Sequence, residues 1–310
     1  MSDPLYKANR VPEPDWFLPD VYEKAPSRPP VAYSLGSRLL RGLKQNRLAC
    51  LCVCFLLVLT LASLFAFLAP QDPNKTNMME KFAQPSSAHW FGTDHLGRDY
   101  FTRCLYGGRV SMAVGVFSML LSILIGTLYG TVSGFAGGRV DTCMMRILDI
   151  LMSIPSMLLI LILNSMIPAG VFTLVFTIGI FSWMGVARIV RAETLSVKER
   201  DYVTAARNLG AGRVRILFTH IIPNILSPVL VASSLNIARA ILMESSLSYL
   251  GFGVQVPQAS WGSMLQNAQA YIMTRPLLAV YPGLLILLTV LSFNYLGDVL
   301  RSILEPRLMK

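Results

Sequence analysis

Asp94, His95, Arg98 and Asp99 fall within six consecutive residues and form a group of side chains with possible chemistry. Two carboxylates and an imidazole can bind a metal ion. Arg98 stands between them, however, and the nearby His89 is not at a usual ligand spacing. We therefore predict no metal site. We expect an interlocked network of ion pairs that shapes the surrounding loop, with contact to another protein as a second role.

A second group of polar side chains lies in an apolar stretch. Residues 225–243 contain Asn236 and Arg239, and Glu244 follows directly. A charge in mid-membrane costs roughly 2.5–3.5 kcal/mol, whereas one leucine returns only about 0.3–0.6 kcal/mol. This stretch should therefore face the protein interior or a watery cavity, and we predict that the three residues line a pathway. A buried Arg239–Glu244 pair is the alternative, although five residues is not a same-face helical spacing.

Catalytic chemistry has no comparable support in the sequence. No nucleophile, general base and orienting group come together. The chain also has no G-x-x-x-x-G-K-[ST] phosphate-binding loop. We predict a protein that is not an enzyme and binds no cofactor of its own.

The elements that must position these side chains follow from composition. Of the 310 residues, 54% are hydrophobic and 14% are charged, which is typical of a membrane protein. A helix needs about 20 mostly apolar residues to cross the hydrocarbon. Stretches of this kind occur at residues 48–69, 112–133, 150–168, 171–190, 225–243 and 277–297. We therefore predict an all-α membrane protein with six transmembrane helices.

The orientation in the membrane follows from the distribution of Lys and Arg, because cationic loops stay in the cytoplasm. With the N-terminus inside, the inside segments hold 20 of the 27 Lys and Arg residues and the outside segments hold 6. Both termini are therefore predicted to be cytoplasmic. The net charge of +10 is explained by this topology, and no basic domain is present that could bind nucleic acid.

The segments outside the predicted spans differ in character. Residues 1–47 are rich in proline up to position 36, which indicates a flexible cytoplasmic tail without a cleavable signal peptide. Residues 70–108 form an extracytoplasmic segment too short to be a domain. Trp261 lies in the second external segment, either at the mouth of a pathway or as an interfacial anchor. Residues 299–310 form a cytoplasmic C-terminal tail.

The cytoplasmic segment 196–223 has a regular pattern. Residues 196–199, Ser-Val-Lys-Glu, match a capping box, so we predict that a helix begins there. Apolar residues then follow at i, i+3, i+4 and i+7, namely Tyr202, Ala205, Ala206 and Leu209. Gly210 stands where a left-handed residue would end the helix.

The same spacing is repeated in the second half of this segment. It is formed by Val214, Leu217, Phe218 and Ile221, and Pro223 is predicted to end the second helix. The segment thus builds two short amphipathic helices joined at a glycine. Small Ala205 and Ala206 leave room for a partner to dock closely. The alternative is a linker that lies on the membrane surface.

Three glycines in the second span are also in register. Gly126, Gly130 and Gly134 recur at every fourth residue and form one smooth stripe. Such a stripe lets another helix approach closely. We therefore predict tight helix packing along this face.

Residues 204–223 resemble the E-A-A-x3-G-x9-I-x-L-P signature of permease subunits of bacterial ABC importers. Thr204 stands for Glu, His220 for the first Ile and Ile222 for Leu; the first two substitutions are common in the peptide branch of that family. Four further segments are similar to the C-type permease of dipeptide, oligopeptide and nickel importers. They are FGTDHLGRDYFTR (91–103), GFAGGRVDTCMMRILDILMSIPSMLL (134–159), SLSYLGFGVQVPQASWGSML (246–265) and FNYLGDVLRSILEPRL (293–308).

This resemblance implies a type I ABC importer permease fold with a core at residues 109–298, in the inner or plasma membrane of a bacterium. It implies import of dipeptides or oligopeptides and a heterodimer with a homologous B-type permease. Two cytoplasmic subunits would carry ATP and Mg, and an extracytoplasmic binding protein would deliver substrate. Segment 196–223 would couple to an ATPase through Tyr202, Thr204, Ala205, Ala206, Gly210, Ala211, Gly212, Arg213 and Pro223.

Two alternatives stay open at this point. The cargo could be nickel or another small solute carried by the same family. A self-sufficient secondary transporter would need ionisable residues in several spans, and here only Arg239 is clearly deep.

Overall fold

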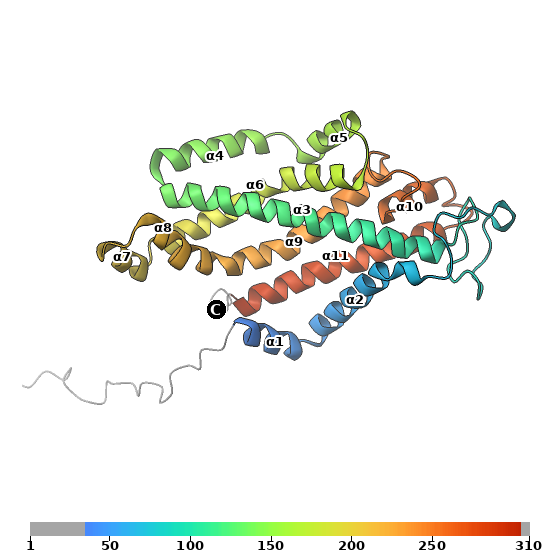
Figure 1. Ribbon diagram of the computed structural model, residues 1–310, viewed down its shortest axis with the longest axis horizontal. Helices are drawn as coiled ribbons and strands as arrows, with labels where there is room; N and C mark the ends of the chain where they lie inside the picture. Colours follow the sequence, from blue (N-terminus) through green and yellow to red (C-terminus); the bar gives the residue numbers. More distant parts are fainter. Residues whose placement is uncertain (1–34, 305–310) are drawn as a thin grey trace, which may run out of the picture. The chain divides into compact units, whose positions relative to one another are not determined.

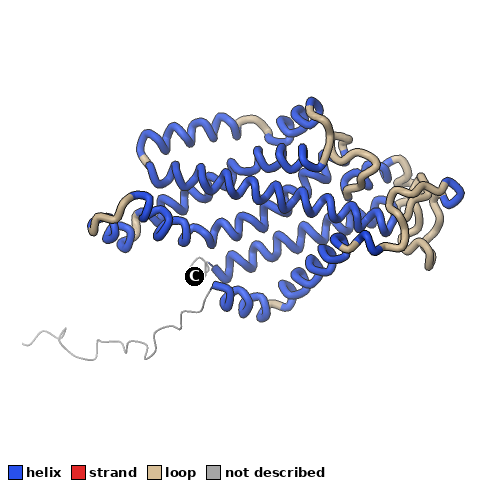
Figure 2. Tube along the Cα trace, viewed as in Figure 1, coloured by secondary structure: helices blue, strands red, loops and turns tan. Residues whose placement is uncertain are grey.

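The computed structural model describes residues 35–304, so residues 1–34 and 305–310 of the two predicted tails lie outside the described range. The chain divides into two compact units, residues 1–38 and 39–310. Helix α1, Leu35–Gln45, begins within the segment predicted as a flexible tail. Residues 35–304 contain no strand, and one isolated bridge joins Thr93 and Asp99. Figure 2 shows how helices dominate and where the loops gather.

Five helices are long and apolar enough to cross a membrane. They are α2 (Arg47–Leu64), α3 (Tyr100–Ala136), α6 (Val171–Lys198), α9 (Ile222–Tyr249) and α11 (Leu277–Leu304) (Figure 1). A bent pair of helices, α4 (Gly138–Met152) and α5 (Ser156–Met166), makes a sixth span if it is counted as one. Each of the six predicted stretches overlaps one of these elements.

The third of the six predicted stretches, residues 150–168, is broken in the structure. Helices α4 and α5 meet at an angle of 70° around residues 153–155. The break occurs at Pro155, which has no backbone N–H to donate and disfavours helical geometry in the residue before it. The predicted third span therefore corresponds to a bent pair of helices, and its break is a finding of the structure.

Helix α3 packs along most of its length against α6 through the predicted glycine stripe. A Cβ atom added to Gly130 would lie 2.4 Å from the carbonyl oxygen of Ala187, and one added to Gly126 would lie 2.6 Å from Cβ of Val186. Gly134 is equally crowded by α6. The predicted close approach of a second helix is confirmed, and only glycine permits it at these positions.

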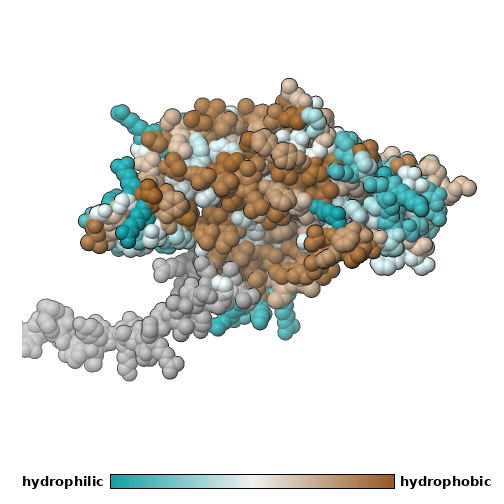
Figure 3. Space-filling model, in the orientation of Figure 1, coloured by the Kyte–Doolittle hydropathy of each residue, from teal (hydrophilic) through white to brown (hydrophobic). Residues whose placement is uncertain are grey.

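Helix α9 is the central element of the described unit. It packs against α3, α6, α11 and the short external helix α10, Trp261–Gln269. Half of its apolar window is buried, a larger share than in α2, α3, α6 or α11. This agrees with the expectation that the polar fifth span faces protein more than lipid. Figure 3 shows apolar side chains over the middle of the visible face, with hydrophilic residues at both ends.

Candidate functional site

The connection between α6 and α9 builds the candidate site, and its beginning differs from the prediction. Helix α6 continues to Lys198, so Ser196 lies inside it instead of capping a new helix. Val197 is 1% exposed and packs in the core, so burial favours continuing the helix over a side-chain cap. Helix α7, Asp201–Asn208, starts only after the turn at residues 199–200. The predicted capping box is therefore wrong.

The end of α7 follows the prediction. Gly210 has a φ of 82°, which is the left-handed region. Its N–H donates to the carbonyl oxygen of Arg207, and the N–H of Ala211 donates to that of Ala206, both at 3.0 Å. This pair of bonds is a Schellman motif, and it satisfies carbonyl groups at the helix end. The glycine fixes the sharp turn between α7 and α8, Arg213–Ile216.

Three apolar side chains fix this connection to the helices that cross the membrane. Val203 of α7 and Ile221 are 0% exposed, and Ile216 of α8 is 2% exposed. They pack in one cluster with Val190 and Val197 of α6. Burying a side chain of this size contributes about 1.5–3 kcal/mol. The connection is therefore held firmly against the end of α6.

The outer side of the connection is also apolar, and this side is exposed. The exposed fractions of Tyr202, Leu209, Val214 and Phe218 are 40%, 89%, 69% and 63%. These four residues belong to the two predicted apolar stripes, and we call them the α7–α8 docking surface. Around them, Thr204, Ala205, Gly210, Gly212, Arg213 and Pro223 are exposed, and Ala206 and Ala211 are half-buried.

The sequence therefore located the amphipathic helices but identified their buried sides only in part, through Ile221 of the second stripe. Val203 and Ile216, which contact the core, stand outside the two stripes. Helical spacing alone does not say whether an apolar stripe faces its own core or a partner. The sequence did contain a signal for the buried side, because each helix has a further apolar residue, Val203 or Ile216, that does not belong to its stripe.

Pro223 does not end the second helix, contrary to the prediction. Helix α8 passes through a π-helical turn, Leu217–Ile221, directly into α9, and the N–H of Ile222 donates to the carbonyl oxygen of Leu217. Pro223 lies directly after this π-helical turn, at the second residue of α9, and the helix continues through it. The docking surface is therefore joined to the central helix by continuous helical backbone.

Ion pairs fasten α6 to its neighbours at the same end of the molecule. Nε and Nη2 of Arg191 donate to the two carboxylate oxygens of Asp141 at 2.5 and 2.6 Å. Nζ of Lys198 donates to the carbonyl oxygen of Phe135 at 2.9 Å. A bidentate guanidinium–carboxylate pair is directional as well as strong. Helices α3, α4 and α6 are thus held together beside the docking surface.

A basic cavity adjoins the α7–α8 docking surface. It has a volume of about 410 Å³ and lies between the end of α3 and the α7–α8 connection. Lys198, Arg207 and Arg213 are among its lining residues. A partner that covers the apolar residues would meet positive charge here, which favours acidic groups on that partner.

Glu244 lies in the interior of the same fold, far from the docking surface in sequence. It is 0% exposed, and the hydroxyls of Ser111 on α3 and Ser248 on α9 each donate to it at 2.7 Å. The Ser111 hydroxyl also accepts the N–H of Trp261 at 3.2 Å, and the Ser248 hydroxyl accepts the N–H of Val254 at 3.2 Å. Each serine is thus oriented by two bonds, and Glu244 connects α3, α9 and the start of α10.

Trp261 begins the short helix α10 and is buried in the protein. Its side chain is 0% exposed and its Nε1 donates to the carbonyl oxygen of Cys104 at 3.0 Å. Gly107 and Gly108 of α3 provide the space that the indole ring fills. A fully buried ring does not anchor in the membrane interface, so that alternative is wrong. The position of Trp261 at a pathway mouth stays a prediction.

The structure brings Asp94, Arg98 and Asp99 together with two residues of neighbouring elements. Nη2 of Arg98 lies 2.7 Å from Oδ2 of Asp94, and Nε of Arg103 lies 3.7 Å from the same oxygen. Nδ1 of His89 lies 2.8 Å from Oδ1 of Asp99. Asp94, Arg98 and Asp99 are all buried. The side chains thus form two adjacent groups, Arg98 and Arg103 on Asp94 and His89 on Asp99. No group of three metal-ligating side chains occurs within residues 35–304.

His95 lies at the edge of these two groups. Burial lowers its pKa below the ordinary value of 6.5, and the nearby Asp94 opposes that effect. The ring stacks on Tyr271 with 5.7 Å between centroids. The neutral imidazole therefore fits its surroundings better than the charged one.

Comparison with known proteins identifies the family. Residues 122–310 match the family model described as binding-protein-dependent transport system inner membrane component. Residues 34–85 match a second model, the N-terminal TM domain of oligopeptide transport permease C. The chain belongs to the family of binding-protein-dependent transport system inner membrane components.

Relatives of this inner membrane component cover nearly its full length. The oligopeptide transport system permease protein OppC of Bacillus subtilis (strain 168) is 40% identical over 89% of the chain and 91% of the relative. The dipeptide transport system permease protein DppC of the same strain is 38% identical over 97% and 95%. The glutathione transport system permease protein GsiD of Pectobacterium atrosepticum is 40% identical over 86% and 89%.

A solved structure shares the fold of the inner membrane component. The MetNI methionine ABC transporter in an inward-facing conformation aligns with a TM-score of 0.54 at 16% identity. The alignment covers 64% of this chain and 94% of the other. It supports the predicted fold of an ABC importer permease.

Two of the predicted pathway residues of the inner membrane component are separated by the structure. Arg239 is exposed, whereas Glu244 is buried on another side of α9. Asn236 is 8% exposed and donates to the carbonyl oxygen of Ala232 within the same helix. Among the described residues, no ion pair joins Arg239 to Glu244. The alternative of a buried Arg239–Glu244 pair is therefore wrong.

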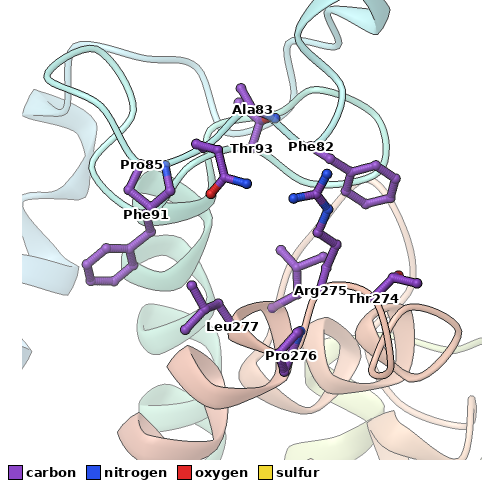
Figure 4. Close-up of a pocket in the computed structure, with 11 residues that line it drawn as sticks. Phe82, Ala83, Pro85, Phe91, Thr93, Thr274, Arg275, Pro276 and Leu277 are labelled. Carbon is purple, nitrogen blue, oxygen red and sulfur yellow. The ribbon is translucent and has the colours of Figure 1, made fainter.

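A cavity on the external side of the inner membrane component was not predicted. It has a volume of about 230 Å³ and lies between residues 82–93 and 274–278 (Figure 4). Arg275 lines it beside Phe82, with its guanidinium carbon 5.7 Å from the ring centroid. Phe91 stacks on Tyr281 with 4.2 Å between centroids. The sequence signal was the pair of phenylalanines within a polar external segment.

Proposed function

We propose that this chain is the permease subunit of an ATP-driven importer for dipeptides or oligopeptides. It forms half of the translocation pathway together with a homologous B-type permease, and separate cytoplasmic subunits bind ATP and Mg and hydrolyse the ATP. The observation that carries the proposal is the α7–α8 docking surface. Exposed apolar side chains at the Lys- and Arg-rich end of a membrane protein need a soluble partner to cover them.

The structure supports coupling by rigid-body motion. Domain closure needs a stiff contact on which to act. Val203 and Ile216 fix the docking surface to the end of α6, and the π-helical turn joins it to α9. A displacement of the surface is therefore carried to both helices at once. The glycine stripe then carries it from α6 to α3.

The cargo is proposed from the names of the relatives. The relatives at 38–41% identity are named as oligopeptide, dipeptide, glutathione and peptide permeases. A substrate-binding protein on the external side would deliver the peptide. The charged groups around Asp94, Arg98 and Asp99 would hold the external loops in the shape that this protein meets.

A crosslinking experiment tests the coupling role. Cysteines are introduced at Ala206 and Ala211 after the five native cysteines are replaced, and the chain is co-expressed with candidate ATPase subunits in membranes. We expect crosslinks to an ATPase subunit. A cysteine at the exposed Ser165, in the last turn of α5 at the predicted external end of the third span, is the matched control and should give none. Absence of any crosslink from Ala206 and Ala211 under all nucleotide conditions would refute the coupling role.

A transport experiment tests the cargo and the need for partners. The complete complex in proteoliposomes should take up a labelled dipeptide or oligopeptide only with ATP. Uptake by this chain alone would favour a secondary transporter instead. If the complex takes up nickel or glutathione with ATP but takes up no peptide, the proposed peptide cargo is wrong and the proposed permease role stands.

A further inference from the structure

Arg239 occupies an unusual position among the exposed residues of the spans. It lies ten residues before Tyr249, the last residue of α9, and four residues before the outer end of the predicted span 225–243. At 1.5 Å per residue it is therefore about 6 Å inside the outer end of that span, in the outer half of the hydrocarbon layer. Within residues 35–304 no carboxylate pairs with it.

The exposed residues that share the face of Arg239 form a short stripe. Leu242, Ser246 and Tyr249 follow Arg239 at intervals of three, four and three residues, so they lie on one side of α9, and all four are exposed. The stripe carries hydroxyl groups between the guanidinium and the external end of the helix. We name these four residues the α9 stripe.

The exposed faces of two neighbouring spans are different. On α3, the exposed residues within the predicted span are Phe117, Leu120, Leu124, Leu128 and Val132. On α11, they are Leu277, Val280, Leu284, Leu287, Leu288 and Leu291. These faces suit lipid. The α9 stripe does not, because a guanidinium without a counter-charge requires water or an anion.

We propose that the α9 stripe lines the translocation pathway and that Arg239 binds the C-terminal carboxylate of the passing peptide. This inference rests on the proposed function. A free α-carboxylate is shared by linear peptides of any sequence, and a guanidinium binds it through two parallel hydrogen bonds. One fixed cation on the pathway wall recognises this group without reading side chains. Ser246 and Tyr249 supply hydroxyl groups between Arg239 and the external entrance.

The first experiment compares a peptide with its C-terminal amide in the complete complex. ATP-driven uptake of both is measured for the wild type, Arg239→Gln and Arg239→Lys. The binding protein is the same in every case, so its own preference cancels when ratios are compared between variants. We expect the ratio of free-acid to amide uptake to fall about tenfold in Arg239→Gln, as the loss of one charge-assisted hydrogen bond implies. Arg239→Lys keeps the charge but loses the two-bond geometry, so its ratio should lie between those of the wild type and Arg239→Gln.

Other outcomes overturn the proposal. An equal loss of both peptides in Arg239→Gln would mean that Arg239 pairs with the neighbouring permease or acts structurally. Unchanged uptake of both would mean that it faces lipid. If the wild-type complex takes up neither peptide, the proposed cargo itself has failed, which is visible before any variant is compared.

A second experiment keeps Arg239 intact, so it does not depend on the folding of its variants. Leu242 of the α9 stripe and Leu284 of α11 are both 46% exposed, and each is replaced by cysteine in a cysteine-free complex. We expect Leu242→Cys to react severalfold faster with an anionic than with a cationic water-soluble thiol reagent, because Arg239 concentrates anions. Free peptide should slow this reaction and amidated peptide should not. Leu284→Cys should stay unmodified; modification of neither cysteine would refute a watery α9 stripe.

Discussion

Replacing Gly130 by alanine tests the close packing of α3 on α6 most directly. The added Cβ would lie 2.4 Å from the carbonyl oxygen of Ala187 and 2.9 Å from Cβ of Val190. Ordinary contact begins at 3.4 Å, so the two helices must separate locally by about 1 Å. The nearest atom belongs to the backbone, which has no alternative rotamer. We expect the overpacking to lower the free energy of unfolding by about 1–3 kcal/mol.

Gly185→Ala is the matched control for this substitution. Gly185 lies on α6 of the same helix pair, and a Cβ there would meet nothing within 4 Å. Alanine has a higher helix propensity than glycine by up to about 1 kcal/mol, so this variant should be neutral or more stable. Both free energies are measured by denaturation in mixed detergent micelles. If Gly130→Ala is as stable as Gly185→Ala, the packing argument is refuted.

Three further predictions concern the other sites. Leu209→Asp should abolish ATP-driven uptake without unfolding the chain, because Leu209 is 89% exposed; Val203→Asp, at a buried position, should instead lower the folded yield. Glu244→Ala should lower the free energy of unfolding by about 1–3 kcal/mol more than Glu244→Gln, because the amide can still bond the serine hydroxyls that alanine leaves unpaired. Because burial lowers the pKa of His95 in the folded protein, locally unfolded states of this segment bind a proton more readily than the folded state does. The protection factors of amides in residues 70–99, which correct for the intrinsic pH dependence of exchange, should therefore fall as the pH drops below 6.5, and less so in His95→Gln.

The positions of the spans could be predicted because membrane insertion depends on composition along the chain. Apolar length alone located all six stretches, and the glycines of α3 indicated a close helix neighbour. The break at Pro155 was visible as a proline in the sequence. The angle of 70° between α4 and α5 could not be predicted, because a helix interrupted by proline can kink or divide depending on what packs against it.

The α7–α8 docking surface was only partly predictable. The left-handed turn at Gly210 follows from local geometry, so the sequence signal was sufficient. The choice between Tyr202 and Val203 as the buried residue was not local. It depends on the position of α6, because Val203 packs against the apolar residues of α6 whereas Tyr202 stays exposed.

Two local signals were overruled in the same segment. The capping residues at 196–199 compete with burial of Val197 in the core, and burial is the larger contribution to the free energy of folding. Pro223 removes one backbone donor, but the π-helical turn directly before it changes the hydrogen-bond spacing at that point, and the helix continues.

The sequence by itself determined that this protein crosses the membrane, which segments cross it, and where a glycine turn interrupts the cytoplasmic connection. These features depend on side-chain polarity and backbone freedom, which each residue carries with it. The tertiary structure decided which side of each helix is free. Arg239 and Glu244 lie five residues apart on α9, but only Glu244 meets the serines of its own fold. Arg239 is left exposed because no neighbouring helix covers that side of α9.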